Sequence, residues 1–181
     1  MGRQEATFWY AMKVFYNRAP LVQEEFMGMH FDTYLPTMIV EKEVNGQTEH
    51  FERPIIASLL FVKCPERFLI DYKREHGDYM LYYTEAGTGK PGKIDNDQME
   101  NFRLATSIEN PDIMYLGPDD GTLSEGDKVI VTDGLYKGRI GYIKRIKHAR
   151  RFLVKIDGIA VVAISHIHPQ YLKKYEPETG S

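Results

Sequence analysis

The alternation of apolar and polar positions predicts strands separated by helices along the first two thirds of the chain. Residues 7–16, TFWYAMKVFY, are aromatic and β-branched without Gly or Pro, which favours a strand. Residues 55–62, IIASLLFV, are apolar on successive positions, as expected of a central strand buried on both faces. Residues 78–84 repeat the aromatic pattern, and residues 113–116 predict a short closing strand. Asn45-Gly46 predicts a tight hairpin.

Three other segments have helical spacing. Pro20 suits the first turn of a helix whose apolar face carries Leu21, Val22, Phe26 and Met29. Residues 65–75 predict a second helix, and residues 95–107 a third, capped by Asp95 or Asn96. The resulting order, β-α-β-β-α-β with one helix appended, predicts an α+β fold with an antiparallel sheet and helices largely on one face.

The last third of the chain predicts a small all-β domain. Val129 to Val131 are β-branched and suit a strand, and Asp133-Gly134 forms a turn dipeptide. Gly138 and Gly141 follow, and small residues there let the backbone pass close to a neighbouring strand. Residues 152–167 continue a strand pattern rich in Ile and Val, with no sustained helical stripe. We therefore expect this region to be β-structured at rest.

These glycines carry a resemblance to a known motif. Their spacing after an apolar run resembles the KOW motif, which begins a small five-stranded, SH3-like barrel in ribosomal proteins and in NusG-type transcription factors. The residues that match the motif are Gly126, Asp127, Gly134, Gly138 and Gly141. An ordinary glycine-rich hairpin is the alternative interpretation.

Charge divides the chain into two parts of opposite sign. The net charge of the 181 residues is −3, yet residues 124–175 carry 11 Lys and Arg against 4 Asp and Glu. Residues 1–123 carry 12 against 20. This asymmetry favours two domains with different partners. A basic barrel could contact nucleic acid or a ribosomal surface, whereas a solvated basic face is the simpler explanation.

Several classes of protein are disfavoured. No apolar run approaches the roughly 20 residues of a membrane helix, and the first residues lack a signal-peptide pattern. Cys64 is the single cysteine, so an internal disulfide and an all-cysteine metal site are excluded. We expect a monomer in the reducing cytoplasm, with Cys64 as a small core residue and no membrane partner.

Two motifs suggest enzyme chemistry but lack essential parts. Residues 87–93, GTGKPGK, fit the phosphate-loop spacing, but Ile94 replaces the Ser or Thr that holds magnesium. Pro91 also removes a backbone N–H from such a loop. His166 and His168 are two residues apart, but no third ligand lies near them in sequence. We therefore expect no cofactor, no metal site and no catalysis.

The first domain resembles the NGN domain of NusG proteins. Trp9-Tyr10 matches the start of their first strand, Arg53-Pro54 leads into a matching central strand, and residues 92–95 match the entry to their third helix. The resemblance implies a ferredoxin-like βαββαβ domain followed by a KOW barrel. The expected divisions are residues 1–116 for the NGN domain, 117–123 for a linker, 124–176 for the KOW domain and 177–181 for a tail.

Within the family, three segments are similar to the UpxY-type paralogues, which serve long operons for surface polysaccharide. These segments are residues 15–18, 34–36 and 54–62. Two departures from general NusG proteins agree with this: residues 57–59 replace their Pro-Gly-Tyr, and residues 157–159 replace a Phe-Gly-Arg turn. That turn helps the general factor to bind Rho, so its loss puts Rho binding in question.

The resemblance implies a mechanism without chemistry. NGN domains dock on the clamp helices of RNA polymerase and reach across to the gate loop, which favours the closed clamp and disfavours pausing. Docking requires apolar side chains on one sheet face, and the alternative is that they face the domain's own helices. The candidates for docking are Ala11, Leu59, Phe61, Leu81 and Tyr83; those for the gate loop, by position alone, are Ile70, Asp71 and Tyr72. Tyr16, Asn17 and Arg18 are the candidates for contact with non-template DNA.

The sequence thus predicts a transcription elongation or antitermination factor that binds RNA polymerase and suppresses pausing or termination. The alternative is a ribosome-associated or RNA-binding KOW protein. In either case ribosomal protein S-ten is a candidate partner of the barrel. Purified RNA polymerase should retain a transcription elongation factor but not a ribosome-associated or RNA-binding protein, so a retention experiment distinguishes these two functions.

Overall fold

The computed structural model describes residues 5–109, 112–119, 123, 127–165 and 167–179. The chain divides into two compact units, Met1–Glu100 and Asn101–Ser181. They are called the N-terminal and C-terminal units below, and each is described by itself. Together they form the mixed α+β class that the sequence predicted.

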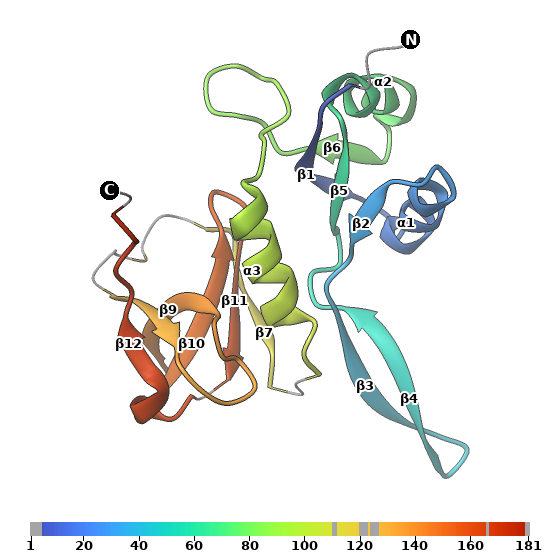
Figure 1. Ribbon diagram of the computed structural model, residues 1–181. Helices are drawn as coiled ribbons and strands as arrows, with labels where there is room; N and C mark the ends of the chain where they lie inside the picture. The colour runs from blue at the N-terminus through green and yellow to red at the C-terminus, as the bar shows by residue number, and fades with distance from the viewer. Residues whose placement is uncertain (1–4, 110–111, 120–122, 124–126, 166, 180–181) are drawn as a thin grey trace. The chain divides into compact units, whose positions relative to one another are not determined.

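The N-terminal unit is built on a four-stranded antiparallel sheet (Figure 1). Its strands are β1 (Thr7–Val14), β2 (Asp32–Tyr34), β5 (Leu59–Pro65) and β6 (Met80–Tyr82), in the order β2-β5-β1-β6. With helices after the first and third of these strands, this is the order of a ferredoxin-like fold. The predicted central position of β5 is confirmed, since it pairs with both β1 and β2.

Helices α1 (Ala19–Gly28) and α2 (Glu66–His76) cover one face of this sheet. Of the apolar face predicted for α1, Val22 and Phe26 are buried, but Leu21 is 65% exposed because neighbouring residues on a helix point in different directions, and Met29, just after the helix, is 44% exposed. Alternate strand residues point toward them, as the two-residue period of a strand requires. Phe26 of α1 lies at the centre, with its ring edge-on to Tyr72 at 4.8 Å and to Phe68 at 5.5 Å. The strand residues of this core are Tyr10, Met12, Val14, Leu60, Val62, Cys64 and Met80.

Cys64 is a core residue, as the sequence predicted. Its side chain is fully buried, and burial raises the pKa of the thiol to about 12. A thiol of this kind stays protonated and unreactive near neutral pH.

A separate hairpin extends away from the four-stranded sheet (Figure 1). Strands β3 (Thr37–Val44) and β4 (Gln47–Pro54) pair only with each other in the described part of the unit. The loop consists of Asn45 and Gly46, with φ of 52° and 78°, the two positive values that a type I′ turn demands. The predicted hairpin is therefore confirmed.

The strand predicted for residues 55–62 starts later than expected. Residues 55–58 form a turn in which Ile55 N–H donates to the Pro36 carbonyl (2.8 Å) and Leu59 N–H donates to the Ile56 carbonyl (3.2 Å). The chain must reverse there to pass from the hairpin back into the sheet. The apolar run therefore contains both a turn and a strand, which hydrophobicity alone does not distinguish.

Helix α3 (Asn96–Thr106) begins as the sequence predicted and runs across the boundary of the two units. The Asp95 carboxylate caps it, accepting from the backbone N–H groups of Asp97 (2.9 Å) and Gln98 (3.2 Å). Its second half belongs to the C-terminal unit. There, the Asn101 side chain accepts from the Ile140 N–H (2.8 Å) and donates to the Ile140 carbonyl (2.7 Å).

The C-terminal unit contains a six-stranded antiparallel sheet in the order β12-β8-β9-β10-β11-β7. The strands are β7 (Met114–Gly117), β8 (Lys128–Val131), β9 (Ile140–Ile146), β10 (Ala149–Ile156), β11 (Ala160–Ser165) and β12 (Leu172–Lys174). A 3-10 turn, Pro169–Tyr171, leads into β12. The expected β structure of this region is confirmed.

Strand β7 corrects one prediction. The sequence placed residues 113–116 as the strand that closes the N-terminal sheet, but β7 pairs with β11, with Tyr115 opposite Val162 and Met114 opposite Ala163. An apolar run signals a strand without naming its partner, and the edge of β11 supplies the missing hydrogen bonds. The domain limits expected from the sequence stay a prediction.

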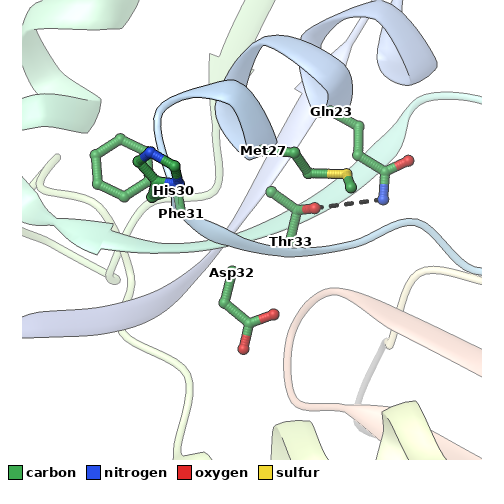
Figure 2. Close-up of a pocket in the computed structure, with 6 residues that line it drawn as sticks. All are labelled: Gln23, Met27, His30, Phe31, Asp32 and Thr33. Carbon is green, nitrogen blue, oxygen red and sulfur yellow. Dashed lines mark hydrogen bonds between the residues drawn. The ribbon is translucent and has the colours of Figure 1, made fainter.

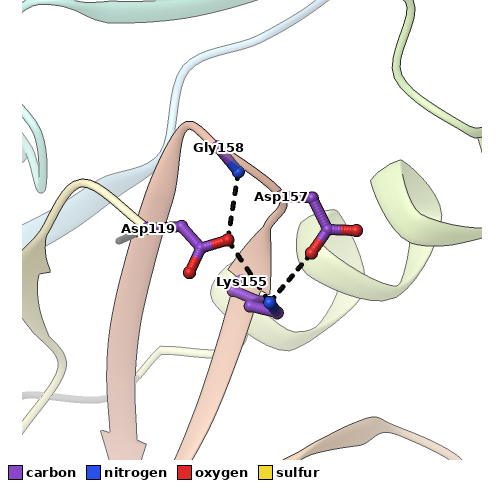
Figure 3. Close-up of polar contacts among 4 residues, drawn as sticks. All are labelled: Asp119, Lys155, Asp157 and Gly158. Atoms are coloured by element: carbon purple, nitrogen blue, oxygen red, sulfur yellow. Dashed lines mark hydrogen bonds and ion pairs between the residues drawn. The ribbon is translucent and has the colours of Figure 1, made fainter. Parts of the chain in front are cut away.

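The segment after β7, predicted as a linker, is tied to the same sheet where it is described. Asp119 Oδ2 lies 3.3 Å from Lys155 Nζ and accepts from the Gly158 N–H at 3.0 Å, while Asp157 pairs with Lys155 at 2.9 Å (Figure 3). The Asp119 carboxylate is 5% exposed and the Lys155 side chain 13%. This cluster, called the Asp119 clasp below, fastens the segment to the β10–β11 turn.

Candidate functional site

The residues predicted to dock on a partner share one face of the N-terminal sheet. Ala11 lies opposite Phe61, and Lys13 lies opposite both Leu59 and Leu81, so these side chains point the same way. Tyr83 continues the face of Leu81, and its N–H donates to the Ala11 carbonyl. The α1 and α2 core uses the alternate residues. The five candidates therefore do not face those helices.

This face is largely buried in the full chain. Ala11 and Phe61 are 0% exposed and Leu59 is 1% exposed, whereas Leu81 is 42% exposed. The Tyr34 ring stacks against Phe61, with ring centroids 6.4 Å apart. Leu81 thus marks the accessible part of the set. Trp9 and Tyr34 belong to the same face by register, although sequence reasoning did not assign them to it.

The three positions proposed near the gate loop are placed differently from one another. Ile70 is 38% exposed. Asp71 pairs with Arg74 (2.8 Å) and Arg67 (3.8 Å) along α2. Tyr72 lies in the core, where its hydroxyl donates to the Glu25 carboxylate at 3.0 Å. Ile70 and Asp71 are therefore available at the surface, whereas Tyr72 is buried and holds α2 against α1.

Burial is the main cause that raises the pKa of the Tyr72 hydroxyl. Its hydrogen bonds with Tyr79 and Glu25 raise the pKa further. The group therefore stays protonated at any physiological pH and acts as a fixed donor.

The turn after β1 presents an exposed aromatic ring on an unusual backbone. β1 ends at Val14, so Tyr16 and Asn17 lie in the turn, with φ of 59° and 56°. Left-handed backbone at two successive residues with side chains costs about 1–3 kcal/mol each. Tyr16 is 78% exposed, and the Arg18 guanidinium lies 4.6 Å from the centre of the Tyr79 ring. The turn thus brings the aromatic ring of Tyr16 and the cation of Arg18 within two residues of each other at the surface.

The glycine motif of the C-terminal unit has a clear structural basis at one position. A side chain at Gly141 would collide with the Leu153 carbonyl and come within 2.6 Å of the Phe152 ring. Gly134 and Gly138 both have φ of 81°, which suits glycine. The close approach predicted from the sequence is confirmed at Gly141. Asp127 precedes β8, and Gly126 lies outside the described residues.

The segment that fits the phosphate-loop spacing is a closed loop. Glu85 N–H donates to the Lys90 carbonyl at 2.9 Å, and Thr84 bridges Pro91. Lys93 Nζ lies 4.2 Å from the centre of the Phe8 ring and 3.7 Å from the Glu66 carboxylate. The Lys93 side chain is thereby held by contacts with β1 and α2.

Of the histidine pair, only His168 lies among the residues that the structure describes. His168 Nδ1 accepts from the Gln170 N–H at 3.4 Å, and His166 lies outside the described residues. Where the structure describes the chain, it contains no group of three or more His, Cys, Asp or Glu side chains that could hold a metal ion.

A surface hollow lies at the end of α1 (Figure 2). It is lined by Gln23, Met27, His30, Phe31, Asp32 and Thr33. Gln23 donates to Thr33 Oγ1 at 3.3 Å, and in Figure 2 the Asp32 carboxylate points away from these two side chains. The polar groups therefore do not converge on a common point, as they do in a ligand site.

Across the described chain, no helix combines the length and apolar character that a bilayer span requires.

Comparison with known proteins gives one family. The family described as "Transcription termination factor nusG" matches residues 7–103. A solved structure described as "Domain interaction in Thermotoga maritima NusG" is 14% identical, covers 94% of this chain and 98% of that chain, and superposes with a TM-score of 0.45. No curated protein matches the chain.

Proposed function

This chain belongs to the NusG family of transcription factors, and we propose on that premise that it is an elongation and antitermination factor. Proteins of this family are not enzymes, and they generally bind RNA polymerase. The observation that carries the proposal is the sheet face shared by Ala11, Leu59, Phe61, Leu81 and Tyr83. Most of this face is buried in the full chain, so Leu81, which is 42% exposed, is the member of the set available to a second protein.

The proposed mechanism is a shift of population in the polymerase. The N-terminal unit docks on the clamp helices through this face, with Leu81 as the accessible contact, and reaches the gate loop with Ile70 and Asp71. Binding the closed clamp more tightly than the open one disfavours pausing. A tenfold reduction in pause occupancy requires only about 1.4 kcal/mol of differential binding.

The turn after β1 is the proposed contact with the non-template DNA strand. The exposed Tyr16 ring can stack on an unpaired base, and stacking contributes about 1–3 kcal/mol per base. Arg18 lies in the same turn and can pair with a phosphate, with Asn17 between them. The strained backbone of the turn supports a role beyond simple connection.

A narrower proposal concerns the operons served. Residues 15–18, 34–36 and 54–62 support a UpxY-type paralogue acting in the cytoplasm on long operons for surface polysaccharide, without Rho. The second candidate, a ribosome-associated or RNA-binding KOW protein, is favoured by the basic composition of residues 124–175. Binding of ribosomal protein S-ten by the C-terminal unit is compatible with both.

Retention of the full chain by purified core RNA polymerase tests the proposal. Leu81→Asp should abolish retention and restore pausing on a template, because a carboxylate cannot be buried in an apolar contact without cost. Leu21→Asp is the matched control, since Leu21 is 65% exposed on α1, which covers the other face of the sheet. Equal retention of both variants would exclude this face, and retention by ribosomes alone would favour the second candidate.

A further inference from the structure

The hairpin of β9 and β10 extends beyond the strands beside it. Among the described residues, β8 pairs with β9 only as far as Tyr142, and β11 pairs with β10 only from Phe152. Residues 143–151 therefore form a two-stranded ribbon whose strands pair only with each other. The register closes with Ile146 opposite Ala149, which leaves Lys147 and His148 as the loop. This ribbon is called the basic arm.

Positive charge is concentrated on the basic arm. It contains five Lys and Arg residues in nine positions and no Asp or Glu: Lys144, Arg145, Lys147, Arg150 and Arg151. The register sets Arg145 opposite Arg150, and Lys144 opposite Arg151. Like charges directly across two strands repel each other and destabilise a hairpin. Five basic residues without an acidic residue in the arm favour a polyanionic partner.

The charges lie on both faces of the ribbon. Arg145 and Lys144 are adjacent on β9, so their side chains, and those of their partners, point to opposite faces. Lys147 adds an exposed charge at the tip, where its φ of 47° allows the two-residue loop. Outside this arm, β9 and β10 are rooted in a buried sheet through Phe152 and Leu153. The charged part can therefore enter a groove while the root stays folded.

We propose that the basic arm binds double-stranded DNA in the major groove, through phosphates and without sequence preference. A ribbon that is positive on both faces fits a groove bordered by two rows of phosphates. The major groove of B-form DNA is about 12 Å wide and admits a two-stranded ribbon. The major groove of A-form RNA is too deep and narrow for side chains to enter. This proposal does not depend on polymerase binding.

Fluorescence anisotropy of the full chain with a short labelled DNA duplex, without polymerase, tests the proposal over a range of salt concentrations. Each phosphate contact contributes about 0.9 to the slope of log affinity against log salt. Arg145→Gln with Lys147→Asn should therefore reduce the slope by about 2 and weaken binding by roughly tenfold or more at low salt. Asn is chosen for position 147 because it tolerates the left-handed backbone.

The control variant removes the same charge elsewhere. Lys173→Gln with Lys174→Gln changes two exposed residues of β12 and should leave the slope unchanged. Equal weakening in both variants, no duplex binding, or tighter binding of an RNA duplex or an acidic protein would overturn the proposal. Circular dichroism checks folding, and Arg151→Gln alone replaces the first variant if that variant fails to fold.

Discussion

Two hairpins of this protein both turn through two-residue loops but present different surfaces. The β3–β4 hairpin and the basic arm both extend beyond the sheet of their unit, and both turn through two residues, the first with positive φ: Asn45 (52°) and Lys147 (47°). Residues 37–54 carry four Glu against Lys42 and Arg53, whereas the basic arm carries no acid. Loop geometry thus sets the register, and the side chains set the kind of partner.

The two hairpins also differ in what stabilises them. β3 and β4 form a two-stranded sheet by themselves, which is marginal in water without further support. Cross-strand contacts between side chains supply part of this support. Val40 lies opposite Phe51, and the Glu41 carboxylate lies 3.6 Å from His50 Nδ1. Lys42 Nζ lies 5.8 Å from the centre of the Phe51 ring. The basic arm continues strands that are buried at their root. We expect the β3–β4 hairpin to open locally and the basic arm to open only with its sheet.

Gly141→Val gives the largest expected effect on this comparison. The added side chain would strike the Leu153 carbonyl and the Phe152 ring at the root of the basic arm. We expect a loss of about 3 kcal/mol in the free energy of unfolding of the C-terminal unit, measured by denaturant titration. Gly138→Ala meets no atom within 4 Å at φ of 81° and should cost only about 1 kcal/mol. Similar losses for both variants would contradict the tight-packing explanation.

The Asp119 clasp gives the next effect, because it fastens the far end of β10 (Figure 3). Asp119→Asn removes the buried charge partner of Lys155 and should destabilise the C-terminal unit by about 1–3 kcal/mol. The β3–β4 hairpin should be unaffected, which hydrogen exchange can show residue by residue. Asp157→Asn is the matched control: Asp157 contacts the same Lys155 Nζ, but its side chain is 67% exposed. Equal losses would show that burial of the Asp119 carboxylate is not what matters.

The same cluster predicts a dependence on alkaline pH. Burial acts against the charged form of Lys155, but the hydrogen bonds and charges of Asp157 and Asp119 outweigh it, so the pKa of the ammonium is raised above its ordinary value. A raised pKa stabilises the fold below the unfolded pKa, and this contribution is lost as pH rises through the folded pKa. Stability of the C-terminal unit should therefore fall at strongly alkaline pH, and Lys155→Met should remove that dependence.

These results separate what the sequence could predict from what it could not. Local signals were reliable: Asn45-Gly46 gave the β3–β4 turn, Asp95 gave the cap of α3, and Gly141 gave the close approach of β9 and β10. The partner of β7 was not predictable, because pairing with β11 depends on residues far along the chain. Hydrophobicity did not indicate the burial of Tyr72 either, since Ile70, two residues earlier, is more apolar and is 38% exposed.

The candidate site shows the same division. Alternation along β5 was enough to group Leu59 with Phe61 on one face, and the register places Ala11 on the same face. Their burial in the full chain is a tertiary property that alternation does not contain. The basic arm was missed for a related reason. A run of basic residues is visible in the sequence, but the direct opposition of Arg145 and Arg150 requires the register that the loop fixes.

The smallest effect on stability should come from the exposed side chains of the β3–β4 hairpin. Ile39 is 44% exposed and Phe51 39% exposed. Both lie on a two-stranded ribbon that pairs with no other strand of the described chain. Ile39→Thr with Phe51→Thr places a β-branched residue that suits a strand at both positions, so we expect a change within about 0.5 kcal/mol in global stability. Hydrogen exchange should quicken only in β3 and β4, because the cross-strand packing of Phe51 on Val40 is lost. The equivalent change at the root of the basic arm, Phe152→Thr, removes a ring that is 0% exposed, so it should cost about as much stability as Gly141→Val and quicken exchange throughout the C-terminal sheet. If hydrogen exchange instead gave the same opening free energy for the β3–β4 hairpin and the basic arm, the distinction between a hairpin that supports itself and one that continues a buried sheet would be wrong.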